Sequence, residues 1–239
     1  MKRIAVYAGS REVYPCMVTA AKSLVSSTAM DEVWFLTEDD DFPEQLPPVI
    51  HTRNMIGQTW FYADGPNYFS HWTYMAMMRL VLPEIFPDVD RILYLDCDTL
   101  VLRDIGELFE IDLHGRLMGA VAEPLKSRPW VSYYNAGVLL MDLAMLRDSH
   151  KQAEMVRMIN AMKFSFPDQD VLNACCLNQI FTLNPTYNSN RWTMNAQNPH
   201  IVHFAADPQY RKNPLWMDYE AREWRVKDAR ESESRVPVD

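Results

Sequence analysis

The fold of this chain is decided by Asp90-Arg91-Ile92-Leu93-Tyr94-Leu95-Asp96-Cys97-Asp98-Thr99-Leu100-Val101, an apolar run that ends in two carboxylates separated by one residue. The continuous apolar segment from Ile92 to Leu95 is typical of a strand buried on both faces of a parallel sheet. Open α/β sheets bind ligands at the carboxyl ends of their strands. Because side chains alternate along a strand, we expect Asp96 and Asp98 to point to the same side and to offer oxygen atoms to one hard cation. The stretch therefore predicts a metal site delivered by a buried strand.

The alternative interpretation of these two aspartates is that they cap the turn after the strand, since Asp is common where strands end. Two adjacent carboxylates repel each other, however, and a bound cation relieves that repulsion. We therefore favour the metal site over the turn cap.

Composition indicates a compact globular protein. The chain has 239 residues, 48% of them hydrophobic and 23% charged, and no Gly/Ser-rich or repetitive segment divides it. The net charge is −9. Because no cluster of Lys and Arg is long enough to follow a phosphate backbone, we expect no nucleic-acid partner.

The cysteines and the hydropathy pattern bear on location. The spacing of Cys16, Cys97, Cys175 and Cys176 matches no metal-thiolate motif, so we interpret them as reduced thiols of the core. The amino terminus lacks the long apolar region of a signal peptide, and no apolar run reaches the length of a membrane span. We therefore expect a cytoplasmic protein, and peripheral attachment to a membrane stays open.

The order of elements favours a mixed α/β fold in a single domain. The pattern predicts strands at 4–8, 32–36, 49–52, 92–95, 118–122 and 134–141. It predicts helices at 15–26, 74–82 (ending at Pro83), 105–109, 143–162 (interrupted near His150) and 168–179 (capped by Asp168). Residues 1–227 would form the domain, and 228–239 a charged tail that we expect to be disordered.

An aromatic block runs from Trp60 to Tyr74 and is broken by Gly65-Pro66. Its rings could pack in the core, or they could form a wall for a flat sugar or base ring. If exposed, the block could instead be an interface between subunits; the sequence leaves the oligomeric state open.

Further blocks surround the opening stretch. These are Arg79-Leu80-x-Leu82-Pro83-Glu84, Pro87-x-x-Asp90 continuing through Thr99, Tyr134-Asn135-Ala136-Gly137-Val138-Leu139-Leu140-Met141-Asp142, Pro167-Asp168-Gln169-Asp170-Val171-Leu172-Asn173, Tyr187-Asn188 and His203-Phe204. In this order, between about Val6 and Lys212, they resemble glycosyltransferase family 8, the retaining transferases that include lipopolysaccharide galactosyl- and glucosyltransferases and glycogenin-like enzymes. The resemblance implies a GT-A fold, a Rossmann-like mixed central sheet flanked by helices.

The resemblance also implies a metal and a nucleotide-sugar donor. His203, which on its own would more often be a core histidine, becomes the third metal ligand beside Asp96 and Asp98. An imidazole next to two carboxylates favours Mn²⁺, with Mg²⁺ as the alternative. The donor would be a UDP-sugar, and the acceptor a glycan or lipid-linked glycan.

The resemblance assigns the remaining residues to the donor. Asp168 and Gln169 match catalytic residues that hold the transferred sugar, and an amide such as Gln169 is a poor nucleophile, which argues against covalent double displacement. We favour same-face substitution in an ion-pair-like state. The other residues implied to contact the donor are Ala8, Gly9, Tyr14, Arg79, Cys97, Asn135 and Lys212. The residues alone would also allow Arg79 to be a salt-bridge partner of Glu84 or Asp90.

The chain departs from the family pattern at two places. After His203 the family usually has Gly three residues on and Lys six residues on, where this chain has Ala206 and Gln209. Lys212 comes later, so an altered loop would have to bring it to the diphosphate. The acidic residues after the first strand are also replaced, and Tyr14 is offset by one from the family's aromatic residue.

We therefore expect a retaining, Mn²⁺-dependent hexosyltransferase that uses UDP-glucose or UDP-galactose in the assembly of a cell-surface glycan. Two alternatives remain. A non-catalytic nucleotide-sugar binder is favoured by the altered loop. A sugar-1-phosphate nucleotidyltransferase would typically carry a Gly-rich, basic loop after the first strand, and Gly9-Ser10-Arg11 is a poor version of it.

Overall fold

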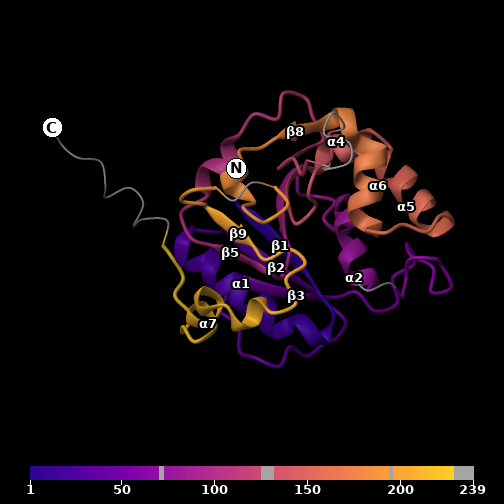
Figure 1. The fold of residues 1–239 in the computed structure, drawn as a ribbon. Coiled ribbons are helices and arrows are strands. Elements are labelled where there is room, and N and C mark those ends of the chain that lie inside the picture. Colours follow the sequence, from indigo (N-terminus) through magenta and orange to yellow (C-terminus); the bar gives the residue numbers. More distant parts are fainter. Residues whose placement is uncertain (70–72, 125–131, 194–195, 229–239) are drawn as a thin grey trace.

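A computed structural model describes residues 1–69, 73–124, 132–193 and 196–228, and a seven-stranded sheet forms its centre (Figure 1). The strand order is β3-β2-β1-β4-β7-β6-β8. The strands are β1 (Ile4–Ala8), β2 (Glu32–Thr37), β3 (Ile50–Asn54), β4 (Arg91–Leu95), β6 (Met118–Ala120), β7 (Val138–Asp142) and β8 (Ile180–Thr182). Strands β1 to β4 are mutually parallel, whereas β7 runs antiparallel to both β4 and β6. The sheet is therefore mixed, as predicted.

Strand β4 is buried on both faces, as its continuous apolar run predicts. Ile92 and Tyr94 pack into one hydrophobic cluster, and Leu93 and Leu95 pack into the other. Helix α1 (Tyr14–Ser27) belongs to the second cluster. The first cluster is formed with α2 (Tyr74–Met77), α3 (Leu82–Ile85), α4 (Leu143–Asp148), α5 (Lys151–Ala161) and α6 (Pro167–Cys176). The sheet is thus flanked by helices on both faces.

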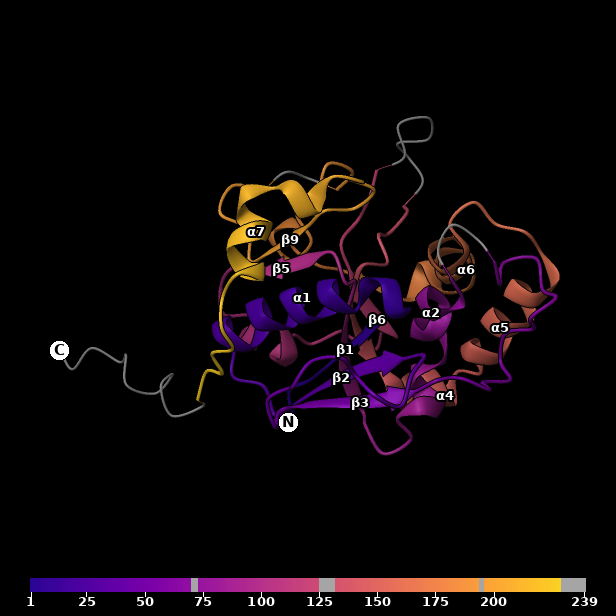
Figure 2. The ribbon, with the colours of Figure 1, turned by 90° about the horizontal axis from the view of Figure 1, so that it is seen from below.

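A small second sheet joins two distant parts of the chain. Strand β5 (Thr99–Val101) pairs antiparallel with β9 (Ile201–His203), so that Thr99 lies opposite His203. Helix α7 (Pro214–Glu220) follows, and its buried Trp216 packs with Leu100 of β5. Figure 2 shows α7, β5 and β9 together beside α1. This pairing carries His203 to the end of β4.

The break near His150 is confirmed. His150 has a φ of 58°, the left-handed region, and lies between α4 and α5. A residue in this conformation cannot continue an α-helix, so the apolar pattern across 143–162 belongs to two helices.

Two predicted helix ends are wrong. The predicted helix at 74–82 does not end at Pro83. A 3₁₀ turn (Met78–Val81) divides it into α2 and α3, and Pro83 lies in the first turn of α3. Proline is tolerated there because the first amide groups of a helix have no intrahelical acceptor. Likewise Asp168 does not cap α6 but lies inside its first turn, after Pro167.

The aromatic block divides between core and surface. Phe61 and Tyr74 are buried, whereas Tyr62 and Phe69 are exposed. Trp72 lies outside the described residues, as does 229–239 of the predicted tail. The four cysteines are free thiols, three of them buried, as predicted. Within the described ranges, no helix combines the length and hydropathy needed to cross a bilayer.

We predict that Leu93→Ala destabilises the fold by about 2 to 5 kcal/mol, because Leu93 is 0% exposed at the centre of the sheet. Urea unfolding followed by circular dichroism measures this loss. The matched control is Ile56→Ala, which removes a side chain that is 65% exposed and should cost within about 0.5 kcal/mol. Equal losses in the two variants would contradict the described core.

Candidate functional site

The carboxyl end of β4 holds the two aspartates in a tight connection to β5. The amide of Asp96 donates to the Gly137 carbonyl at 2.8 Å, which ties the connection to the start of β7. The Asp96 carbonyl in turn accepts from the Thr99 hydroxyl at 2.7 Å. The backbone of the Asp-x-Asp segment is therefore fixed from both sides.

His203 reaches both aspartates. Its Nε2 atom lies 3.2 Å from Asp98 Oδ1 and 3.6 Å from Asp96 Oδ2. One ligand atom from each of the three side chains lies within 4.8 Å of the others. The structure thus brings together the three predicted metal ligands, and their donor set of two carboxylates and one imidazole fits a divalent cation such as Mn²⁺.

Gly137 makes this approach possible. A Cβ atom at this position would lie 2.2 Å from His203 Cε1 and 2.7 Å from Asp96 Oδ2. Both distances are far below van der Waals contact. Any side chain at residue 137 would therefore push the imidazole and the carboxylate apart.

The charged groups of the cluster shift one another's pKa values. Burial lowers the pKa of His203, but Asp98 and Asp96 outweigh burial and raise it above its usual value. Burial raises the pKa of Asp98, and His203 outweighs burial and brings it below its usual value. A bound divalent cation would take over the role that the imidazolium has here, the neutralisation of the two carboxylates.

A buried amide sets the orientation of the imidazole. His203 Nδ1 lies 2.9 Å from Asn188 Oδ1, and Asn188 is 0% exposed. Asn190 donates its Nδ2 to the same oxygen at 3.0 Å, so this oxygen is an acceptor and Nδ1 carries a proton toward it. In the neutral ring, Nε2 then keeps its lone pair on the side of the aspartates, the arrangement a metal-binding histidine needs. Asn188 belongs to one of the sequence blocks, but the sequence analysis assigned it no role. The run of short polar residues Asn188-Ser189-Asn190 was the sequence feature that could have indicated a buried hydrogen-bonding role.

Arg79 forms the opposite wall of the site. It is 4% exposed, and its guanidinium binds Asp96 at 2.7 Å and Asp168 at 3.1 Å. It also donates to the Ala136 carbonyl at 2.6 Å and lies over the Tyr94 ring at 4.3 Å. The alternative pairing with Glu84 or Asp90 is absent from the described contacts, where Arg79 instead joins the metal strand to the start of α6.

The side-chain amides of Asn135 and Gln169 both contact Glu123, a residue that the sequence analysis did not suggest. Gln169 accepts from the Ala136 amide at 2.9 Å, and its Nε2 lies 3.4 Å from Glu123 Oε2. Asn135 donates to the same Glu123 oxygen at 2.9 Å and accepts from Asn188 at 2.8 Å. A continuous polar network therefore runs from His203 to Gln169.

Ala8, Gly9 and Cys97 lie together beside the aspartates. The Cys97 thiol donates to the Ala8 carbonyl at 3.3 Å, and a Cβ at Gly9 would lie 3.4 Å from Cys97 Sγ. These three residues thus adjoin the predicted metal ligands.

Tyr14 was assigned to the donor by the resemblance, with packing as the alternative, and the structure favours packing. Tyr14 is 2% exposed, and its ring packs on Phe42 with 4.9 Å between centroids. Its hydroxyl donates to Asp39 at 2.9 Å and accepts from the Glu38 amide at 2.8 Å. Burial raises the pKa of this hydroxyl to about 12. No face of the ring is open to a base.

The altered loop after His203 keeps an unusual backbone. Ala206, at the position of the expected glycine, has a φ of 53°, and its carbonyl accepts from Arg191. Lys212 ends the 3₁₀ turn Tyr210–Lys212 and is exposed, without a described contact to Asp96 or Asp98. The structure therefore does not bring Lys212 into the cluster.

Comparison with known proteins identifies relatives of this arrangement. The model of the family described as "Glycosyl transferase family 8" matches residues 7–208. General stress protein A of Bacillus subtilis is 29% identical over 166 residues, which are 56% of this chain and 58% of that protein. The chain spans about half the length of the curated relatives it matches.

Solved structures share the fold. The glycosyltransferase GlyE of Streptococcus pneumoniae superimposes with a TM-score of 0.71 at 21% identity, covering 94% of this chain and 61% of that one. The galactosyltransferase LgtC, in complex with donor and acceptor sugar analogs, gives a TM-score of 0.70 at 20% identity and covers 96% of this chain and 99% of that one. The predicted GT-A type of mixed sheet is therefore confirmed. With a family model that spans most of its length, the chain belongs to glycosyl transferase family 8.

Proposed function

We propose that residues 1–227 form the catalytic domain of a metal-dependent, retaining glycosyltransferase. It would move a hexose from UDP-glucose or UDP-galactose to a glycan or lipid-linked acceptor. The observation that carries this proposal is the convergence of Asp96, Asp98 and His203 at the carboxyl edge of the sheet. Family membership supports it, as do LgtC, a galactosyltransferase solved with donor and acceptor sugar analogs, and a relative named lipopolysaccharide 1,3-galactosyltransferase in Salmonella typhimurium.

Breaking the bond between a sugar and a diphosphate leaves two negative charges on the leaving group. Held by Asp96, Asp98 and His203, Mn²⁺ would supply Lewis-acid stabilisation for that charge. The carboxylates and the imidazole do not need to reorganise for this, because Gly137, Arg79 and Asn188 already fix their positions.

Asp168 and Gln169 would bind the transferred sugar and would not attack its anomeric carbon. Asp168 is engaged by Arg79, and the Gln169 carbonyl oxygen accepts from the Ala136 amide. Both groups are suited to orient sugar hydroxyls, and an amide is a poor nucleophile. This supports substitution on the same face of the sugar within a short-lived ion pair, in preference to a covalent glycosyl-enzyme. A structure of LgtC described as an active-site mutant replaces a glutamine by a glutamate, which agrees with a role for an amide in this family.

A nucleotide-sugar binder without transferase activity is the second candidate, and the observation that favours it is the exposed position of Lys212. Among the described residues, the cations at the aspartates are Arg79 and His203, both already paired. Family membership gives no support to a nucleotidyltransferase.

We predict that Asp98→Asn reduces metal-dependent release of UDP by at least about 100-fold, because it removes one anionic ligand from the cluster. UDP release is measured with UDP-glucose and UDP-galactose in the presence of Mn²⁺, and EDTA should abolish it. The matched control is Asp112→Asn, whose side chain is 76% exposed and distant in sequence from the cluster, and which should keep full activity. Release by native protein that survives EDTA would contradict metal dependence, and binding of UDP without release would favour the binder.

We predict that Asn188→Ala weakens Mn²⁺ binding by roughly 10- to 100-fold, because the imidazole loses the partner that fixes its orientation. Isothermal titration calorimetry with Mn²⁺ and UDP measures the affinity. Asn178→Ala, a change of an exposed asparagine in the turn before β8, serves as the control and should leave Mn²⁺ affinity unchanged. Unchanged affinity in Asn188→Ala would show that His203 does not depend on this amide.

We predict that Gly137→Ala abolishes measurable Mn²⁺ binding while the protein still folds. The added methyl group would occupy the space of His203 Cε1, at 2.2 Å, so the ligands must separate. Calorimetry measures the loss, and the far-ultraviolet circular dichroism spectrum confirms the fold. Native-like affinity in this variant would contradict the close approach of residue 137 to the imidazole.

A further inference from the structure

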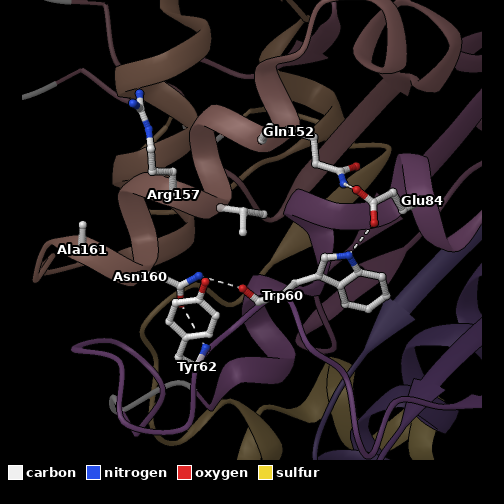
Figure 3. A pocket seen from close by; sticks show the side chains of 9 residues that line it. Trp60, Tyr62, Glu84, Gln152, Arg157, Asn160 and Ala161 are labelled. Atoms are coloured by element: carbon white, nitrogen blue, oxygen red, sulfur yellow. Dashed lines mark hydrogen bonds between the residues drawn. The ribbon is translucent and has the colours of Figure 1, made fainter.

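A hollow of about 500 Å³ lies between the segment around Trp60 and Tyr62 and helix α5 (Figure 3). This volume is in the range of small-ligand sites. Its principal lining residues are Trp60, Tyr62, Glu84, Gln152, Arg157 and Asn160. None of its lining residues belongs to the candidate metal and donor site.

The Trp60 ring and the backbone of Tyr62 are held in place by side chains of the same hollow. The Trp60 indole donates to Glu84 at 2.6 Å. Asn160 donates to the Trp60 carbonyl at 2.7 Å and accepts from the Tyr62 amide at 3.0 Å, so one amide clamps the aromatic segment onto α5. Figure 3 shows these bonds across the hollow. The Trp60 ring is therefore in place before any ligand arrives, which lowers the entropic cost of binding.

Part of the lining has no structural role that accounts for it. The Tyr62 side chain is 59% exposed although it is large and aromatic. Gln152 is only 7% exposed, donates to Glu84, and has no described hydrogen-bond partner for its Oε1 atom. Because this Oε1 atom has almost no accessible surface, a ligand in the hollow cannot reach it, and the exposed Glu84 carboxylate is a polar group open to such a ligand.

The chemistry of the lining selects the ligand. Aromatic faces combined with amides and one carboxylate suit a molecule that has both C–H faces and many hydroxyl groups. The Glu84 carboxylate, which lies at the Trp60 ring, would repel a phosphate, so the lining favours a neutral ligand. Figure 3 shows the Arg157 guanidinium directed away from the rings, so no cation faces the hollow from this residue. A lipid chain would cover the exposed Glu84 carboxylate without offering it a hydrogen-bond donor, whereas a sugar hydroxyl can donate to it.

The hollow is joined to the catalytic side by the end of α5. Asn67, on the segment that follows Tyr62, donates to the Ile159 and Met162 carbonyls at 2.6 Å and accepts from the Phe164 amide at 3.0 Å. The chain then enters α6, whose first turn carries Asp168. A ligand in the hollow would therefore rest on the segment that leads into the sugar-binding side of the donor site.

We propose that this hollow is a carbohydrate-binding subsite that holds a pyranose ring of a glycan chain, outside the reaction centre. Tyr62 and Trp60 pack against the ring's C–H face, and the polar lining pairs with its hydroxyl groups. If this glycan is the acceptor of the transfer reaction, that identification rests on the proposed function. The binding of a saccharide in the hollow does not rest on it.

The test is a saccharide titration followed by the indole N–H signal of Trp60 in ¹⁵N-labelled protein, assigned with Trp60→Phe. The probes are methyl α-D-glucopyranoside, methyl β-D-galactopyranoside, lactose and maltotriose. We expect a saturable shift with at least one probe, and we expect Tyr62→Ala to weaken binding by about tenfold or more. Phe69→Ala is the matched control, because Phe69 is 84% exposed near Tyr62 in sequence but does not line the hollow. It should bind as the native protein does.

Two results would overturn the subsite: no shift with any probe, or a shift that Tyr62→Ala leaves unchanged while its thermal unfolding matches that of native protein. Tighter binding of lactose or maltotriose than of the methyl glycosides supports a site for a glycan chain. Equal or weaker binding of these two oligosaccharides points to a free monosaccharide and overturns the assignment to a glycan chain. The titration contains neither metal nor nucleotide. A failure of UDP release would therefore sink the proposed transferase without affecting this result, and the reverse also holds.

Discussion

The organisation of this protein depends on the cost of placing carboxylates next to one another at the end of a buried strand. Asp96 and Asp98 leave β4 together, and Asp168 approaches them from α6. Such a group is stable only with cations of matching geometry beside it. Arg79 bridges Asp96 and Asp168, while His203 pairs with Asp98 and Asp96. The long connections of the chain serve to bring these two cations in.

The second sheet is the means by which His203 arrives. Pairing of β5 with β9 fixes the register that sets Thr99 opposite His203, and Gly137 leaves room for the imidazole. Asn188 then determines which ring nitrogen faces the aspartates. Since each constraint acts on a different bond or rotation of the same side chain, loss of any one leaves the others unable to restore the geometry.

The sequence could predict features that depend on local pattern. The buried strand β4 follows from its apolar run and is present. The two aspartates do meet at one site, but not through strand alternation: they lie after Leu95, in the turn between β4 and β5. The position of His203 could not be derived in that way, because strand pairing between distant segments leaves no local signal, and only the resemblance suggested it. Tyr14 is the opposite case: the resemblance assigned it to the donor, and the sequence alone could not choose between that role and packing, which its buried ring now favours. Pro83 and Pro167 were misleading because proline ends a helix in its interior but is favoured in its first turn.

After His203 the sequence differs from the family pattern at Ala206, where the family usually has glycine. Ala206 adopts the left-handed conformation that glycine would adopt, at a cost of about 1 to 2 kcal/mol, and Arg191 binds its carbonyl. Glycine adopts this conformation without that penalty, so the backbone at residue 206 is one in which a glycine would be at ease. The replacement of glycine is therefore not by itself an argument against transfer. What separates a transferase from a binder here is charge: a leaving diphosphate needs a cation that is not already paired, and Arg79 and His203 are both engaged by carboxylates. A divalent cation held by Asp96, Asp98 and His203 would supply Lewis-acid stabilisation for that charge without Lys212.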